Sequence, residues 1–68
     1  MVLKQPTPAE IREVREAAGL TQTEAAELVH LGDRVRWTEY ESGERNIDLA
    51  RWELFLLKTA KRRRKSQA

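Results

Sequence analysis

The sequence predicts a small all-α domain of four helices. Three observations favour this class: helix-capping residues recur along the chain, apolar residues follow them at helical spacing, and no stretch alternates as a β-strand does. A chain of 68 residues buries only about 60% of the surface that it exposes when unfolded, so its core is small. We expect an N-terminal arm over 1–6, one domain over 7–60 and a basic tail over 61–68.

The first two helices each begin with a capping box. In TPAE at 7–10 a threonine hydroxyl caps the helix, proline takes the first helical position and glutamate the third. The same box recurs as TQTE at 21–24, two residues after Gly19, which ends the first helix because glycine readily adopts the left-handed turn. So short a link predicts that the second helix, ending near Val29, crosses the first steeply.

The third helix is bounded by a polar cap and a glycine. Residues 30–32 form a short connection with one apolar side chain. Asp33 or Gly32 can cap the helix that follows, which runs to about Ser42 and ends at Gly43. The second helix, the connection and the third helix therefore have the dimensions of a helix-turn-helix, in which two helices cross near a right angle.

Two adjacent alanines, Ala25 and Ala26, mark the expected crossing point. Alanine is the best helix former and also lets another backbone come close. The alternative is that the pair is ordinary helix filler. We favour the crossing, and we expect the third helix to pass over these alanines with its far side free.

These features, in their order and spacing, resemble a known family. TQTEAAELV at 21–29 followed by WTEYESGERN at 37–46 resembles the helix-turn-helix of lambda repressor-like, Cro and XRE-type regulators. LARWELFLLK at 49–58 is similar to a compact subset from phages and mobile elements, which includes anti-CRISPR-associated autoregulators. The resemblance implies a DNA-binding regulator of transcription, cytoplasmic and nucleoid-associated in a bacterial cell. One residue is inserted before Trp37 relative to the family pattern, which leaves the register of residues 34–36 open.

The outward side of the third helix follows from its aromatic positions. Trp37 and Tyr40 share one side at helical spacing, and core packing is a better interpretation of this pair than stacking on single-stranded bases. The other side carries arginine, valine, threonine and glutamate, all able to bond or touch base edges in the major groove. We predict DNA base contacts from Arg34, Val35, Arg36, Thr38 and Glu39.

A second set of residues is expected to contact the DNA backbone. The resemblance implies a phosphate contact from Gln22, at the amino end of the second helix, where free amides add partial positive charge. Thr23 can add its hydroxyl, and Arg45 and Asn46 after Gly43 resemble the family's backbone clamp. The alternatives for these four residues are helix capping and simple exposure.

The fourth helix has more apolar surface than a small domain can cover. Asp48 caps it, Ile47 can pack against Trp52 across the cap, and residues 54–57 are all apolar. We predict that the uncovered side joins two copies of the chain and sets their third helices about 34 Å apart on an inverted repeat. The alternative is a frayed helix end with a tolerated exposed patch. The predicted homodimer contact comprises Trp52, Phe55, Leu56 and Leu57.

Composition and charge narrow the possible functions. The net charge is +2, yet residues 1–60 hold eight basic and eleven acidic residues, and the five basic residues at 61–65 reverse this balance. That tail can be a solvated end, a set of cations at a helix terminus or an arm for phosphates. With no cysteine and a single His30, we expect no metal site, no cofactor, no small-molecule ligand and no enzymatic activity. No segment approaches the ~20 apolar residues of a membrane span.

Two functions follow from these observations. The first is a sequence-specific transcriptional regulator, most simply a dimeric autorepressor that binds an inverted repeat in double-stranded promoter DNA through the third helix. The second is an antitoxin-like or adaptor module that holds another protein through the fourth helix. The two are not exclusive, and the stoichiometry of the isolated protein separates them.

Overall fold

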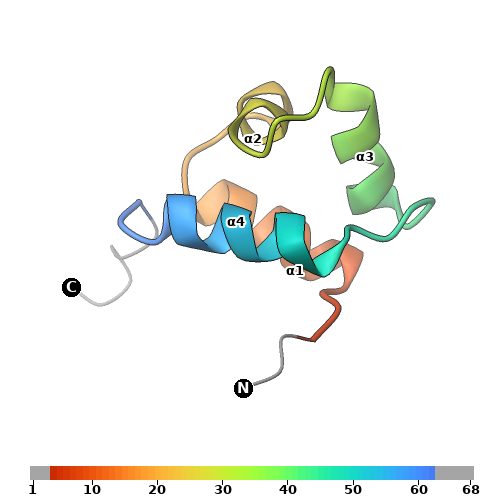
Figure 1. Ribbon diagram of the computed structural model, residues 1–68, viewed down its shortest axis with the longest axis horizontal. Coiled ribbons are helices and arrows are strands. Elements are labelled where there is room, and N and C mark those ends of the chain that lie inside the picture. The colour runs from red at the N-terminus through yellow and green to blue at the C-terminus, as the bar shows by residue number, and fades with distance from the viewer. Residues whose placement is uncertain (1–3, 63–68) are drawn as a thin grey trace.

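The computed structural model describes residues 4–62, and over this range it contains helices and no strand. The helices are α1 (Pro8–Ala17), α2 (Gln22–Leu28), α3 (Arg34–Ser42) and α4 (Leu49–Thr59). In Figure 1, α4 is seen in front of α1, α2 is seen nearly end-on above them, and α3 runs down one side. The predicted all-α fold is confirmed.

The helix starts follow from local side-chain chemistry. Thr7 and Glu10 form a reciprocal capping box at α1, with bonds of 3.1 and 2.9 Å between each side chain and the other residue's backbone N–H. Thr21 and Glu24 repeat this box at α2 with the same distances, and Asp48 caps α4. Each box satisfies two N–H groups that a helix end leaves without a partner.

The core lies between all four helices and is dominated by aromatic rings. Trp37 and Phe55 are fully buried with ring centroids 4.8 Å apart, and Tyr40 meets Trp37 edge-on at 5.8 Å. Such pairs contribute about 1 kcal/mol beyond the area they bury. The prediction that Trp37 and Tyr40 face the core is therefore confirmed. Ile47 and Trp52, on either side of the α4 cap, are also buried.

Basic side chains from the C-terminal third cover the ends of the first two helices. Arg51 and Lys58 of α4 donate to the last carbonyls of α2 at 3.0 and 2.8 Å, and α2 has no basic residue in its own last turn. Arg62 of the basic tail donates to the carbonyl of Ala18 at 3.2 Å. Cations at these positions oppose the negative end of the helix dipole. The tail thus contributes one arginine to the fold, and its residues 63–68 lie outside the described range.

The end of the N-terminal arm also packs on the domain. Pro6 is buried, and the Gln5 amide donates to the carbonyl of Ile47 at 2.8 Å. This bond joins the arm to the segment before α4. The predicted arm over 1–6 is therefore in contact with the domain at residues 5 and 6, while residues 1–3 lie outside the described range.

Candidate nucleic-acid interface

α2 and α3 form the helix-turn-helix that the sequence predicts. Ala25 and Ala26 are 0% and 1% exposed, and both lie on the side of α2 that faces the core. Figure 1 views α2 nearly along its axis and α3 from the side, so the two helices cross steeply. Small side chains suit such a crossing, because a larger residue would hold a second backbone away.

The turn between α2 and α3 is made by a histidine rather than by its glycine. His30 has a φ of 65°, in the left-handed region, whereas Gly32 is not in that region. Leu31 then donates its backbone N–H to the carbonyl of Ala26 at 2.9 Å, which closes the turn over α2. Asp33 ends the turn, and its carboxylate accepts the N–H of Val35 at 3.0 Å. The helix α3 then begins at the next residue, Arg34.

The outward side of α3 begins with three exposed residues. Arg34, Val35 and Arg36 are all exposed, Val35 to 57%, although valine is an apolar residue. Thr38 and Glu39 follow and are half-buried, and the Thr38 hydroxyl donates to the carbonyl of Val35 at 2.7 Å. The five residues predicted to contact bases therefore lie outside the core, on the same helix whose Trp37 and Tyr40 are buried.

Glu39 is held by two arginines on this surface. Its Oε1 accepts a hydrogen bond from Arg45 Nε at 2.9 Å and lies 3.7 Å from Arg36 Nε. The Arg36 pair was foreseeable from the helical spacing of the two residues. The shorter pair with Arg45 was not, because Arg45 lies beyond the end of α3 and reaches Glu39 only after the chain turns at Gly43.

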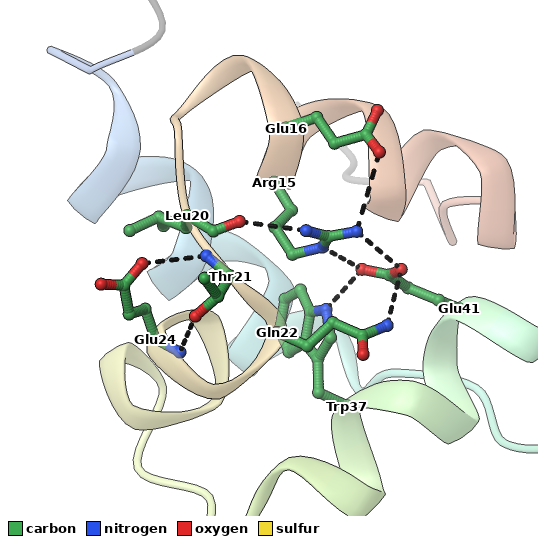
Figure 2. Close-up of polar contacts among 8 residues, drawn as sticks. All are labelled: Arg15, Glu16, Leu20, Thr21, Gln22, Glu24, Trp37 and Glu41. Carbon is green, nitrogen blue, oxygen red and sulfur yellow. Dashed lines mark hydrogen bonds and ion pairs between the residues drawn. The ribbon is translucent and has the colours of Figure 1, made fainter.

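A second carboxylate, Glu41, binds α3 to the two preceding helices (Figure 2). Arg15 of α1 donates to it through Nε at 2.6 Å and through a second guanidinium nitrogen at 3.2 Å. Trp37 Nε1 donates to it at 2.6 Å and Gln22 Nε2 at 3.2 Å. The Glu41 side chain is only 7% exposed and that of Arg15 14%. Side chains from α1, α2 and α3 therefore meet at this one carboxylate.

The network keeps Glu41 ionised. Burial by itself raises the pKa of a carboxyl group, but hydrogen bonds from Arg15, Trp37 and Gln22, together with the charge of Arg15, outweigh it and lower the pKa of Glu41 below its ordinary value of 4.5. At neutral pH the buried charge is therefore paired and fully bonded. This satisfies the condition under which a buried ion pair is tolerated.

The sequence contains a signal for the role of Glu41. Trp37, Tyr40 and Glu41 are spaced as i, i+3 and i+4, so all three occupy one side of the helix. A carboxylate on a core-facing side requires a cation nearby. Arg15 lies one turn after Ile11 on the core-facing side of α1, which made it a candidate for that cation.

The residues predicted to contact the DNA backbone lie in different surroundings. Gln22 is half-buried and its amide nitrogen is engaged by Glu41. Thr23 and Asn46 are exposed at the start of α2 and just before α4. Arg45 is exposed but paired with Glu39. These four predictions remain predictions, and two of the side chains need to change partner or use another atom to reach a phosphate.

The predicted dimer contact on α4 divides between core and surface. Trp52 and Phe55 are 5% and 0% exposed within the single chain, and their rings stack 6.0 Å apart, so they have too little free surface to contribute to an interface. Leu56 is half-buried and Leu57 is 69% exposed. The predicted surface was too large, because four consecutive apolar residues in a sequence do not reveal which of them the other helices cover. A contact through α4 would have to rest on Leu57 and Leu56, with Leu49, which is 39% exposed.

Over residues 4–62 no three side chains of the types that bind metals are grouped so as to hold an ion. None of the helices in this part of the chain combines the length and apolar character that crossing a bilayer requires.

The fold and its exposed helix define a class, the helix-turn-helix domains, whose second helix enters the major groove of duplex DNA. Comparison with known families gives the same result. The family described as helix-turn-helix domain matches residues 9–65. The chain belongs to this family, since the match covers most of its 68 residues. No curated protein was found to match it significantly. Membership indicates a DNA-binding regulator whose partner is double-stranded DNA.

Proposed function

We propose that the protein is a sequence-specific transcriptional regulator of the lambda repressor-like, Cro and XRE type, from the compact subset of phages and mobile elements. It binds an inverted repeat in its own promoter as a homodimer and represses transcription by excluding polymerase. It acts on the nucleoid of a bacterial cell. α3 enters the major groove, and residues of α2 and of the loop after α3 contact the phosphates on either side.

The division of α3 into two sides carries the proposal. Trp37 and Tyr40 are 0% and 3% exposed, so the helix cannot rotate about its axis. This fixes Arg34, Val35 and Arg36 on the surface at its amino end. An arginine can bond a guanine edge through two donors, and a valine can pack on a thymine methyl. An exposed valine beside two arginines suits a groove that offers both kinds of contact.

A mobility shift with the DNA upstream of its own gene tests the regulator. We expect a selective shift at submicromolar protein that weakens steeply with salt, because lysine and arginine contacts to phosphates release counterions. A random duplex of the same length is the control. Equal affinity for the two duplexes, or no shift at micromolar protein, would contradict the proposal.

The dimer is the second part of the proposal, and Leu57 tests it. Leu57→Glu places a charge at the most exposed apolar residue of α4, so we expect monomers by sedimentation and operator affinity lower by about 100-fold, because linked half-sites lose their avidity. Ala9→Glu adds the same charge at an exposed position of α1 and should leave the dimer intact. A Leu57→Glu protein that still dimerises would move the contact elsewhere.

A second candidate function rests on the same α4 surface. Leu57 and Leu49 are exposed apolar residues, and they can bind another protein instead of a second copy, as in an antitoxin-like or adaptor module. The stoichiometry of the purified protein separates the two. A homodimer that remains soluble alone favours the regulator, whereas a monomer that becomes soluble only with a co-expressed neighbour favours the module.

A further inference from the structure

Glu39 carries the charge that DNA repels, yet it lies on the side that α3 turns outward. Its side chain is 27% exposed and it borders an open hollow, which Val35, Arg36, Arg45 and the turn at residues 30–33 also line. Phosphates flank the major groove on both sides, so a carboxylate that enters the groove is repelled unless a base edge donates a hydrogen bond to it. A carboxylate on the surface predicted to face DNA therefore requires a functional explanation.

The carboxylate of Glu39 organises the basic residues around it. Arg45 Nε lies 2.9 Å and Arg36 Nε 3.7 Å from the same oxygen. The loop after α3 also folds back on this residue, because the carbonyl of Glu39 accepts the backbone N–H groups of residues 43, 44 and 45 at 3.1, 3.0 and 3.3 Å. Arg45 is thus bonded to Glu39 through its backbone and through its side chain.

Both ion pairs are open to solvent, so they can exchange partners. The side chains of Arg45 and Arg36 are 51% and 47% exposed, and exposed pairs of this kind contribute little to stability. A phosphate can therefore replace Glu39 as the partner of either guanidinium. Until that happens, the carboxylate cancels part of the positive charge on this side of α3.

We propose that Glu39 makes DNA binding selective by keeping Arg36 and Arg45 paired until the correct base lies beneath it. This inference rests on the proposed function. On arbitrary DNA the carboxylate neutralises the two arginines and is repelled by the phosphates. Where a cytosine presents its N4 amino group in the major groove, Glu39 accepts a hydrogen bond from it, and Arg45 turns to a phosphate. Repulsion of wrong partners is a general source of specificity.

The test compares Glu39→Gln with Glu44→Gln. Glu44 is an exposed glutamate in the adjacent loop, so its variant removes the same charge without freeing Arg45. Affinity for a random duplex is measured for both at several salt concentrations. We expect E39Q to bind random DNA about tenfold more tightly than E44Q, with a salt slope steeper by about one phosphate contact, near 0.9 in log–log units. Adding Arg45→Ala and Arg36→Ala to E39Q should remove this gain.

The outcomes separate this inference from the proposed function. A wild-type protein that prefers no duplex over random sequence contradicts the proposed function. A selective wild-type protein whose E39Q variant binds random DNA no more tightly than E44Q overturns only the role of Glu39. A gain that survives the removal of both arginines also overturns it, because neither freed guanidinium would then have a part in the effect.

Selection from a library of random duplexes tests the base that Glu39 recognises. We expect the wild-type protein to select a cytosine at one fixed position of each half-site. Glu39→Ala removes the acceptor that glutamine would keep, so this variant should lose the preference at that position and keep the rest of the selected sequence. The same sequence selected by both proteins would show that Glu39 reads no base. Thermal unfolding of E39Q, expected to match the wild type, confirms that the fold is unchanged.

Discussion

Two glutamates lie two residues apart on α3, and each is paired with an arginine from another segment. The Glu41 side chain is 7% exposed and its partner Arg15 14%, whereas Glu39 is 27% exposed and its partner Arg45 51%. Glu41 receives bonds from α1, α2 and α3. Glu39 receives them only from the surface of α3 and the loop that follows it.

The difference shows how burial decides what an ion pair does. A buried pair fixes its elements, since removing one partner leaves an unpaired charge away from water. An exposed pair is screened and contributes little, so its members remain available for another ligand. One side of α3 therefore holds the helix in place, and the other is free to bind. Four predictions test this contrast.

The largest effect is expected at the buried carboxylate. Glu41→Gln should lower the free energy of unfolding by about 3 kcal/mol, because Arg15 keeps its charge, loses its buried partner and retains the more distant, exposed Glu16 at 3.8 Å. Urea denaturation followed by circular dichroism measures the change. Glu39→Gln is the matched control and should shift it by less than about 0.5 kcal/mol. Equal losses in the two variants would remove the contrast between the two sides.

The exposed side should show the opposite pattern at Arg34. Arg34→Ala should weaken operator binding by about 2 kcal/mol, since it removes a donor pair from a base edge, and should leave the unfolding free energy within about 0.5 kcal/mol of the wild type. Arg12→Ala, which removes an exposed arginine from α1, is the control and should leave binding nearly unchanged. Loss of stability with loss of binding would mean that Arg34 serves the fold.

Acid should weaken the ion pair of Glu41 and Arg15, because protonation removes the charge of Glu41. Hydrogen bonds and the charge of Arg15 lower the pKa of Glu41 in the folded state below 4.5. The stability that this carboxylate contributes is therefore fully present when the pH is above its pKa in the unfolded chain. It is lost as the pH falls through its lower pKa in the folded protein. The difference in unfolding free energy between wild type and Glu41→Gln should shrink as pH falls from neutral to below 4.5. A difference that stays constant would contradict this assignment.

The smallest effect is expected at the turn that orients α3. His30 adopts a φ of 65°, which is strained for a residue with a side chain and natural for glycine. His30→Gly should raise the unfolding free energy by about 0.5 kcal/mol, the relief of strain exceeding the entropy lost by glycine. His30→Ala keeps the strain and is the control. If the alanine variant were as stable as the glycine variant, the turn would not be strained.

The helix boundaries were predictable because local chemistry sets them. Both threonine boxes, the Asp48 cap and Gly43 lie within a few residues of the helix ends that they define. The core-facing side of α3 was predictable for a similar reason, since the spacing of Trp37 and Tyr40 marks it directly.

The remaining features depend on contacts that are distant in sequence. Glu41 and Arg15 are 26 residues apart, and Arg45 reaches Glu39 only after the chain reverses at Gly43. Which of the consecutive apolar residues of α4 are covered depends on how α2 and α3 pack on it, so Trp52 and Phe55 could not be told from Leu57. The left-handed conformation occurs at His30 and not at Gly32, because the bond that closes the turn over α2 determines which residue adopts it.

The central claim is that the outer side of α3 enters the major groove, and methylation interference tests it most directly. Dimethyl sulfate modifies guanine at N7, an atom that lies in the major groove. We predict that modification of at least one guanine in each half-site blocks binding of the wild-type protein, and that Arg34→Ala becomes insensitive to one of them. Selective binding that tolerates N7 methylation throughout the site would contradict the account.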